Sequence, residues 1–139
     1  MGYEGFVHEK DNGLSASAIF YKKDKFQCTS RGHINLDYGP SKTNQGEFEI
    51  SNNENKDGAY HLIYCKLIVS DPSAVGSTPR KEFIFAETHL KAMDNYRKTR
   101  AAQANKVTQF FQENFVGIPL LLAGDFNDFP HTDPLNTFE

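Results

Sequence analysis

Two largely apolar stretches of the sequence each end in polar side chains that can act on a phosphate ester. His89 and Lys91 follow the first stretch, and Asp125 and Asn127 follow the second. An imidazole and a carboxamide donate hydrogen bonds to phosphate oxygens, and a carboxylate orients or deprotonates an attacking water or holds a proton for the leaving group. An ammonium group supplies a positive charge for a further phosphate. These four residues predict phosphoester chemistry, provided that the fold brings them together.

Each of these residues also has a purely structural interpretation. A histidine at the end of a strand is commonly an ordinary rim residue, and Gly, Asp and Asn all favour turns for backbone reasons. The segment from Gly124 to Asn127 can therefore be a turn or a site. The other histidines show no metal-ligand spacing and are interpreted as surface or loop residues; they are His8, His33, His61 and His131.

A local excess of positive charge accompanies the first polar segment. It is formed by Lys91, Arg97, Lys98, Arg100 and Lys106, and is opposed only by Asp94. Such a cluster is either the solvated face of a helix or a patch that attracts a phosphorylated substrate. In the second interpretation, Lys91 and Arg100 are candidate substrate-binding residues.

The elements that must position these residues are those of an α/β fold with a mixed sheet. Strand patterns occur at residues 1–7, 15–21, 26–28, 47–50, 60–69, 82–88 and 118–123. Residues 95–115 carry a stripe at three- and four-residue steps, which predicts one long helix stopped by Gly117. Because 118–123 is almost entirely apolar, we expect it to be a central strand covered on both faces. If this strand and 82–88 are neighbours, their polar ends converge.

The remaining segments are rich in turn-forming residues. Residues 37–46 and 71–80 are predicted to be exposed loops. The polar segment 51–58 is predicted to join 47–50 and 60–69 into an antiparallel hairpin.

The composition excludes several classes of protein. The 139 residues carry 15 Lys and Arg against 18 Asp and Glu, so the formal net charge is −3, and 38% of the residues are hydrophobic. This balance is typical of neither a disordered chain nor a membrane protein. It also argues against a strongly basic surface dedicated to nucleic-acid binding. The two cysteines are far apart, which predicts no zinc site and no disulfide scaffold. The N-terminus has no basic segment followed by an apolar one, which predicts no signal peptide. We therefore expect an intracellular, cytoplasmic protein.

Three motifs together resemble a known family. Thr88-His-Leu-Lys-Ala92, Arg100-Ala-Ala-Gln103 and the segment from Pro119 to Asn127, followed by Pro130, are similar to the endonuclease/exonuclease/phosphatase superfamily. The best match is the branch that contains nocturnin and the carbon-catabolite-repressor-type poly(A) deadenylases. Further similarity at residues 2–6, 18–26 and 42–45 extends the resemblance over essentially the whole chain.

This resemblance implies a magnesium-dependent phosphoesterase, acting on a nucleotide or an RNA 3′ end, built on a two-sheet α/β sandwich of the deoxyribonuclease-I-like kind. In the family, the residue that matches His89 hydrogen-bonds the scissile phosphate, and the residue that matches Asp125 orients or activates the water or serves the leaving group. The residues that match Asn127 and Lys91 contact phosphate. Asp125 and Asn127 are also candidates for a secondary metal position.

The same resemblance predicts that residues 1–139 are one part of a catalytic domain. A Leu-Gln-Glu type motif with a metal-ligand Glu is expected before residue 2, and a Ser-Asp-His motif is expected after residue 139, so the isolated chain is expected to be inactive. Met93 stands where nocturnin-like sequences carry an arginine, and the 71–80 loop is longer than in that branch. The alternatives are a non-catalytic binding module of the same fold and a 2′,5′-phosphodiesterase or another superfamily phosphatase.

Overall fold

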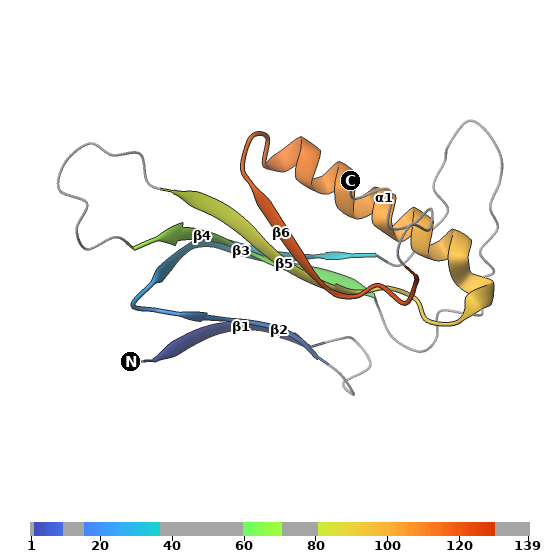
Figure 1. Ribbon diagram of the computed structural model, residues 1–139, viewed down its shortest axis with the longest axis horizontal. Coiled ribbons are helices and arrows are strands. Elements are labelled where there is room, and N and C mark those ends of the chain that lie inside the picture. Colours follow the sequence, from blue (N-terminus) through green and yellow to red (C-terminus); the bar gives the residue numbers. More distant parts are fainter. Residues whose placement is uncertain (1, 10–15, 37–59, 71–80, 130–139) are drawn as a thin grey trace.

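The strands form two sheets, and a long helix lies against the larger one (Figure 1). The computed structural model describes residues 2–9, 16–36, 60–70 and 81–129. In these segments the layers follow one another as small sheet, large sheet and helix. The predicted α/β class and two-sheet sandwich are confirmed.

The small sheet pairs β1 (Tyr3–Glu9) with β2 (Ala16–Lys22) in antiparallel orientation. The large sheet has the order β3-β4-β5-β6, formed by Phe26–Asn35, His61–Val69, Glu82–His89 and Leu120–Asp125. Its first three strands are antiparallel, whereas β6 is parallel to β5. The parallel pair requires a crossover, which is made by the 3₁₀ turn η1 (Asp94–Tyr96) and the helix α1 (Arg97–Asn114).

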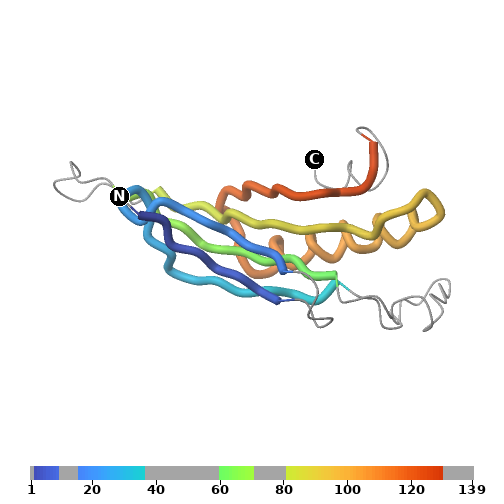
Figure 2. The backbone as a smooth tube through the Cα atoms, turned by 90° about the horizontal axis from the view of Figure 1, so that it is seen from below, coloured from blue at the N-terminus to red at the C-terminus, as the bar shows by residue number. Residues whose placement is uncertain are grey.

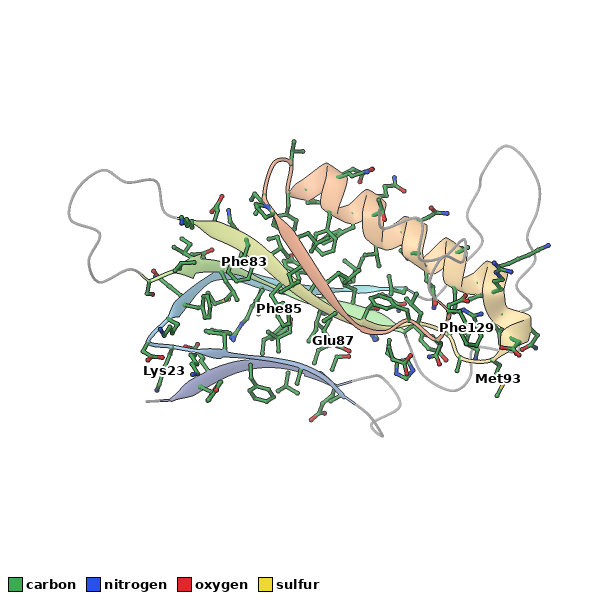
Figure 3. The ribbon with its side chains drawn as sticks, in the orientation of Figure 1. Lys23, Phe83, Phe85, Glu87, Met93 and Phe129 are labelled. Atoms are coloured by element: carbon green, nitrogen blue, oxygen red, sulfur yellow. The ribbon has the colours of Figure 1, made fainter. Side chains whose placement is uncertain are left out.

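Side chains alternate between the two faces of the large sheet, so that β5 contributes to two cores. Ile84 and Ala86 pack towards α1 in a core completed mainly by leucines, Val107 and Phe111. Phe83 and Phe85 point the other way, towards β1 and β2, as Figure 3 shows. This alternation was predicted from the sequence and is confirmed.

The core between the two sheets consists of Ile19, Tyr21, Ile63, Cys65 and Leu67, with phenylalanines around it. Burial, followed by the neighbouring Cys28, raises the pKa of the Cys65 thiol to about 12. Burial also raises the pKa of the Tyr21 hydroxyl, with a further contribution from Cys28. The two sheets therefore enclose groups that stay protonated in the folded chain at neutral pH.

The helix follows the predicted pattern, with a different first turn. Its buried residues are Arg100, Gln103, Ala104, Val107 and Phe111, which confirms the predicted stripe. The predicted start at residue 95 falls in the 3₁₀ turn η1, and regular helix begins at Arg97. At the other end, Gly117 has a φ of 76° and turns the chain towards β6.

The prediction that 118–123 is a central, fully covered strand is wrong for the described part of the chain. β6 lies at one edge of the large sheet, opposite β3, as the view in Figure 2 shows. Leu122 packs into the core below α1, but Leu121 on the other face is 56% exposed. An apolar sequence alone therefore did not distinguish a central strand from an edge strand.

Several predicted features lie outside the described residues. They are the loops 37–46 and 71–80, the strand at 47–50 with its turn at 51–58, the similarity at 42–45, and His131. Within the described segments, no helix is both long enough and apolar enough to cross a bilayer.

Candidate active site

His89 and Asp125 occupy adjacent positions at the ends of the parallel strands β5 and β6. The register pairs these two residues directly, and the backbone N–H of Leu90 donates to the Asp125 carbonyl at 2.9 Å. Because neighbours in one register row share a face of the sheet, the imidazole and the carboxylate both lie on the face towards β1 and β2. The predicted convergence of the two strand ends is confirmed.

Gly124 allows β6 to approach β5 at this point. It pairs with Thr88 in the register and has a φ of 143°, a conformation that residues with a Cβ rarely adopt. A Cβ at this position would overlap the Thr88 carbonyl oxygen and lie 2.9 Å from its carbon and 3.0 Å from the Thr88 nitrogen. The buried Thr88 is itself fixed, since its hydroxyl donates to the His61 carbonyl at 3.2 Å. The glycine of the Gly-Asp-Phe-Asn segment thus sets the spacing between His89 and Asp125.

Asn127 joins the loop after β6 to the loop after β5. Its backbone N–H donates to Oδ1 of Asp125 at 2.9 Å, in a turn that gives Asn127 a φ of 52°. Its side-chain Nδ2 donates to the Leu90 carbonyl at 2.8 Å. The segment is therefore a turn that also fixes the Asp125 carboxylate, so the two interpretations of this segment are compatible.

Contacts hold the backbone N–H, the backbone carbonyl and the ammonium group of Lys91. Its N–H donates to Oε1 of Gln103 at 3.0 Å, and its carbonyl accepts from Arg100 at 3.1 Å. The Nζ atom lies 5.5 Å from the centre of the Tyr60 ring and 4.7 Å from that of Tyr96, both cation–π distances. Since the Tyr60 ring also meets the His89 ring edge-on, with 6.5 Å between centres, the ammonium and the imidazole share one aromatic neighbour.

Arg100 differs from the surface cation that the charge pattern suggested. Its side chain is 3% exposed and forms an ion pair with Asp128, whose side chain is 5% exposed. The Nε atom donates to Asp128 at 2.9 Å, and Nη1 donates to the carbonyls of Lys91 and Met93. Arg97 and Lys98 are exposed on the same helix. The guanidinium is thus buried, with its Nε and Nη1 atoms donating to protein acceptors.

More polar residues gather at this end of the space between the sheets than the sequence interpretation foresaw. In the large sheet, Asn35 pairs with His61, and His33 lies in the same row as Ile63 and Glu87. In the small sheet, His8 pairs with the buried Ser17.

The imidazoles among these residues contact one another across the sheets. The rings of His8 and His33 stack with 3.8 Å between centres, and His61 lies 4.7 Å from His8. Figure 3 shows Glu87 in the same space between the layers. The interpretation of His61 as a surface or loop residue is wrong, because its side chain is only 3% exposed at the start of β4. His61, Ile63 and Cys65 follow one another at two-residue steps, and this alternation was the signal that could have revealed its burial.

The resemblance to the endonuclease/exonuclease/phosphatase superfamily predicts a magnesium ion as the cofactor. Among the described residues, no group of three or more His, Cys, Asp or Glu side chains is placed to hold one. Mg²⁺ takes oxygen ligands in near-octahedral geometry, and Asp125 offers one exposed carboxylate. The described residues therefore do not form a complete metal site.

Comparison with known proteins agrees with the motifs. No family model matches the sequence. Nocturnin of Mus musculus is 28% identical over 142 residues, which cover 94% of this chain and 28% of that protein. The chain thus spans less than a third of the length of this curated relative.

Solved structures give the same result for the fold. The human nocturnin catalytic domain with bound sulfate superposes with a TM-score of 0.74 and 25% identity, covering 99% of this chain and 47% of that one. A mannosyl-6-phosphatase of Bacteroides thetaiotaomicron gives 0.70 and 24%, with the same coverage. The chain is a homologue of the nocturnins and has the fold of the endonuclease/exonuclease/phosphatase family, and it matches part of the nocturnin catalytic domain.

Proposed function

We propose that the protein containing this chain hydrolyses a phosphate ester on a nucleotide or at an RNA 3′ end, by metal-assisted attack of water. The observation that carries the proposal is the pairing of His89 with Asp125 at the ends of β5 and β6. The homology to nocturnins supports the phosphoester class of reaction.

The contacts suggest one role for each residue. His89 donates to a non-bridging oxygen of the scissile phosphate, because its ring lies at the rim of the sheet and is only partly buried. Asp125 orients the attacking water or serves the leaving group, with its carboxylate held by the Asn127 N–H. Lys91 contributes a positive charge to a second phosphate group.

Asn127 can bind phosphate without losing its structural contact. A carboxamide nitrogen carries two hydrogens, and the Leu90 carbonyl accepts one of them. The second N–H is the donor that we assign to phosphate. With these two donors, the proposed phosphate lies between His89 and Asn127, at the ends of β5 and β6.

We assign residues 1–139 to one part of a catalytic domain, with Mg²⁺ as the cofactor of the whole protein. The chain spans 47% of the human nocturnin catalytic-domain structure. In our proposal, the rest of the domain supplies the principal carboxylate ligand of the metal. The isolated chain is accordingly proposed to bind phosphate without turning over a substrate.

Met93 favours a second candidate within the same reaction class. It is 71% exposed, has a φ of 77° and stands two residues after Lys91, where the nocturnin-like pattern has an arginine. An apolar side chain there cannot pair with a phosphate. This difference favours a 2′,5′-phosphodiesterase or another phosphatase over hydrolysis of a dinucleotide that needs the extra cation.

Side-by-side kinetics on the whole protein separate these candidates. The substrates are poly(A), 2′,5′-oligoadenylate and NADP⁺, each with Mg²⁺ and with EDTA. Turnover of one substrate that EDTA abolishes supports the phosphoesterase. Tight binding of an oligonucleotide without hydrolysis supports the non-catalytic module instead. NADP⁺ cleaved no faster than an unrelated phosphomonoester excludes nocturnin-type specificity.

A further inference from the structure

Arg100 is the buried centre of a set of contacts that joins the two loops of the candidate site. Its Nε donates to Oδ2 of Asp128 at 2.9 Å, in the loop after β6. Its Nη1 donates to the carbonyls of Lys91 at 3.1 Å and Met93 at 2.7 Å, in the loop after β5. One guanidinium on α1 therefore contacts both segments that carry the proposed phosphate-binding residues.

The burial of this ion pair calls for an explanation beyond packing. A charge inside a protein is costly unless it is paired and its remaining donors are satisfied. The planar guanidinium satisfies this condition here because its donors point in fixed, different directions, which the single ammonium of a lysine cannot reproduce. Oδ1 of Asp128 in turn accepts the N–H of Phe129 at 3.0 Å. Asp128 is thus bound to the backbone of its own loop and to the helix.

The contacts fix the residues on either side of the proposed phosphate position. Gln103 lies one helical turn after Arg100, and the two side chains hold the N–H and the carbonyl of Lys91. On the other loop, Asp128 directly follows Asn127, whose side chain reaches back to Leu90. Figure 3 shows Met93 and Phe129, the labelled residues of the two loops, at the same end of the molecule.

We propose that Arg100 and Asp128 form a positioning pair: they set the placement of Lys91 and Asn127 for phosphate binding without touching phosphate themselves. This inference rests on the proposed function, because it assumes that phosphate binds between the two loops. It replaces the substrate-binding role that the charge pattern suggested for Arg100. Asp128, which the sequence interpretation did not single out, becomes the residue that makes the arginine a connection between loops.

The test measures binding of inorganic phosphate to the whole protein by NMR, followed at the amides of Lys91 and Asn127. We expect Arg100→Gln and Asp128→Asn each to weaken phosphate binding by about tenfold or more. Arg100→Lys keeps the charge but not the fork, so its affinity is expected to lie between those of the wild type and Arg100→Gln. Lys25→Gln removes the same charge from an exposed turn and is expected to change affinity less than about twofold.

A second control separates positioning from general loss of stability. Phe111→Ala removes a core side chain of the same helix, and phosphate affinity measured where this variant is folded is expected to match the wild type. Amide hydrogen exchange at Leu90 and Lys91 is recorded in parallel. Faster exchange at these amides in Arg100→Gln, with unchanged exchange at Val107, supports the positioning role.

The outcomes separate a failure of the positioning pair from a failure of the proposed function. Folded Arg100→Gln that binds phosphate as the wild type does overturns the positioning pair while leaving the proposed function intact. An equal loss of affinity in Phe111→Ala also overturns it, since the effect is then one of stability. If the Lys91 and Asn127 amide signals of the wild-type protein do not shift when phosphate is added, the proposed phosphate site is contradicted and, with it, the positioning role.

Discussion

Gly124 offers a sharp test of how the fold assembles the site. Replacing it with alanine places a methyl group against the carbonyl of Thr88, on the adjacent strand. Since the methyl group is attached directly to the backbone and its neighbour is a backbone carbonyl, no flexible side chain can move aside to make room. β6 must shift away from β5, and this shift separates Asp125 from His89.

The magnitude follows from two terms. A φ of 143° is strained for any residue with a Cβ, at a cost of about 1–3 kcal/mol. The overlap with Thr88 resembles overpacking of a core, which costs about 1–3 kcal/mol more. The sum, roughly 2–6 kcal/mol, is a large fraction of the stability of a typical domain, about 5–15 kcal/mol.

Gly117 provides the matched control. It also has a positive φ, 76°, but nothing lies within 4 Å of where its Cβ would be. Gly117→Ala should therefore cost only the conformational term, about 1–2 kcal/mol. Urea unfolding gives both values, and hydrogen exchange at the Leu90 amide reports whether its bond to Asp125 survives. Equal destabilisation by the two substitutions would refute the reasoning, because the contact with Thr88 would then contribute nothing.

The free energy of unfolding should fall as pH rises from 9 to 10, with a slope that approaches about 1.4 kcal/mol per pH unit, because the folded Cys65 thiol keeps a proton that the unfolded chain releases. Urea unfolding of Cys65→Ala between pH 9 and 10 should lack this slope, and an unchanged slope contradicts it. Phe111→Ala should destabilise the chain by about 3–5 kcal/mol through loss of its core contacts, measured by thermal unfolding; a cost below about 1 kcal/mol would show that the α1 core is not packed as described. In free-energy terms, the loss of phosphate affinity in Asn127→Asp should exceed the loss of folding stability in Asn127→Gly. The aspartate carboxylate removes both side-chain donors and adds a negative charge, whereas glycine accepts the φ of 52°. Phosphate titration and urea unfolding of both variants decide this last point, and unchanged affinity in Asn127→Asp contradicts it.

Local patterns in the sequence predicted the elements that carry the site. Strict alternation placed Ile84 and Phe85 on opposite faces of β5, and helical spacing gave the buried stripe of α1. Period and turn chemistry depend on near neighbours in the chain, so a sequence reports them well. The joint position of His89 and Asp125 could be predicted because each residue stands at the end of a strand. The helix between the two strands makes them parallel, so that their ends meet at the same edge of the sheet.

What the sequence did not predict depends on partners distant in the chain. Arg100 was included in the buried stripe and also counted as a surface cation; the charge that balances it in the interior comes from Asp128, 28 residues further on. His61 was interpreted as exposed because its contacts with His8 and His33 come from other strands. β6 was expected to be central because its composition is that of a covered strand, yet within the described residues only one of its sides is paired.

The central claim is that His89 and Asp125 act together on one phosphate ester. Single-turnover hydrolysis by the whole protein with Mg²⁺, comparing wild type, His89→Gln, Asp125→Asn and the double variant, tests it most directly. We predict that each single substitution lowers the rate by about 100-fold or more and that the double variant is scarcely slower than either. A folded single variant that keeps more than about a tenth of the wild-type rate would contradict the claim.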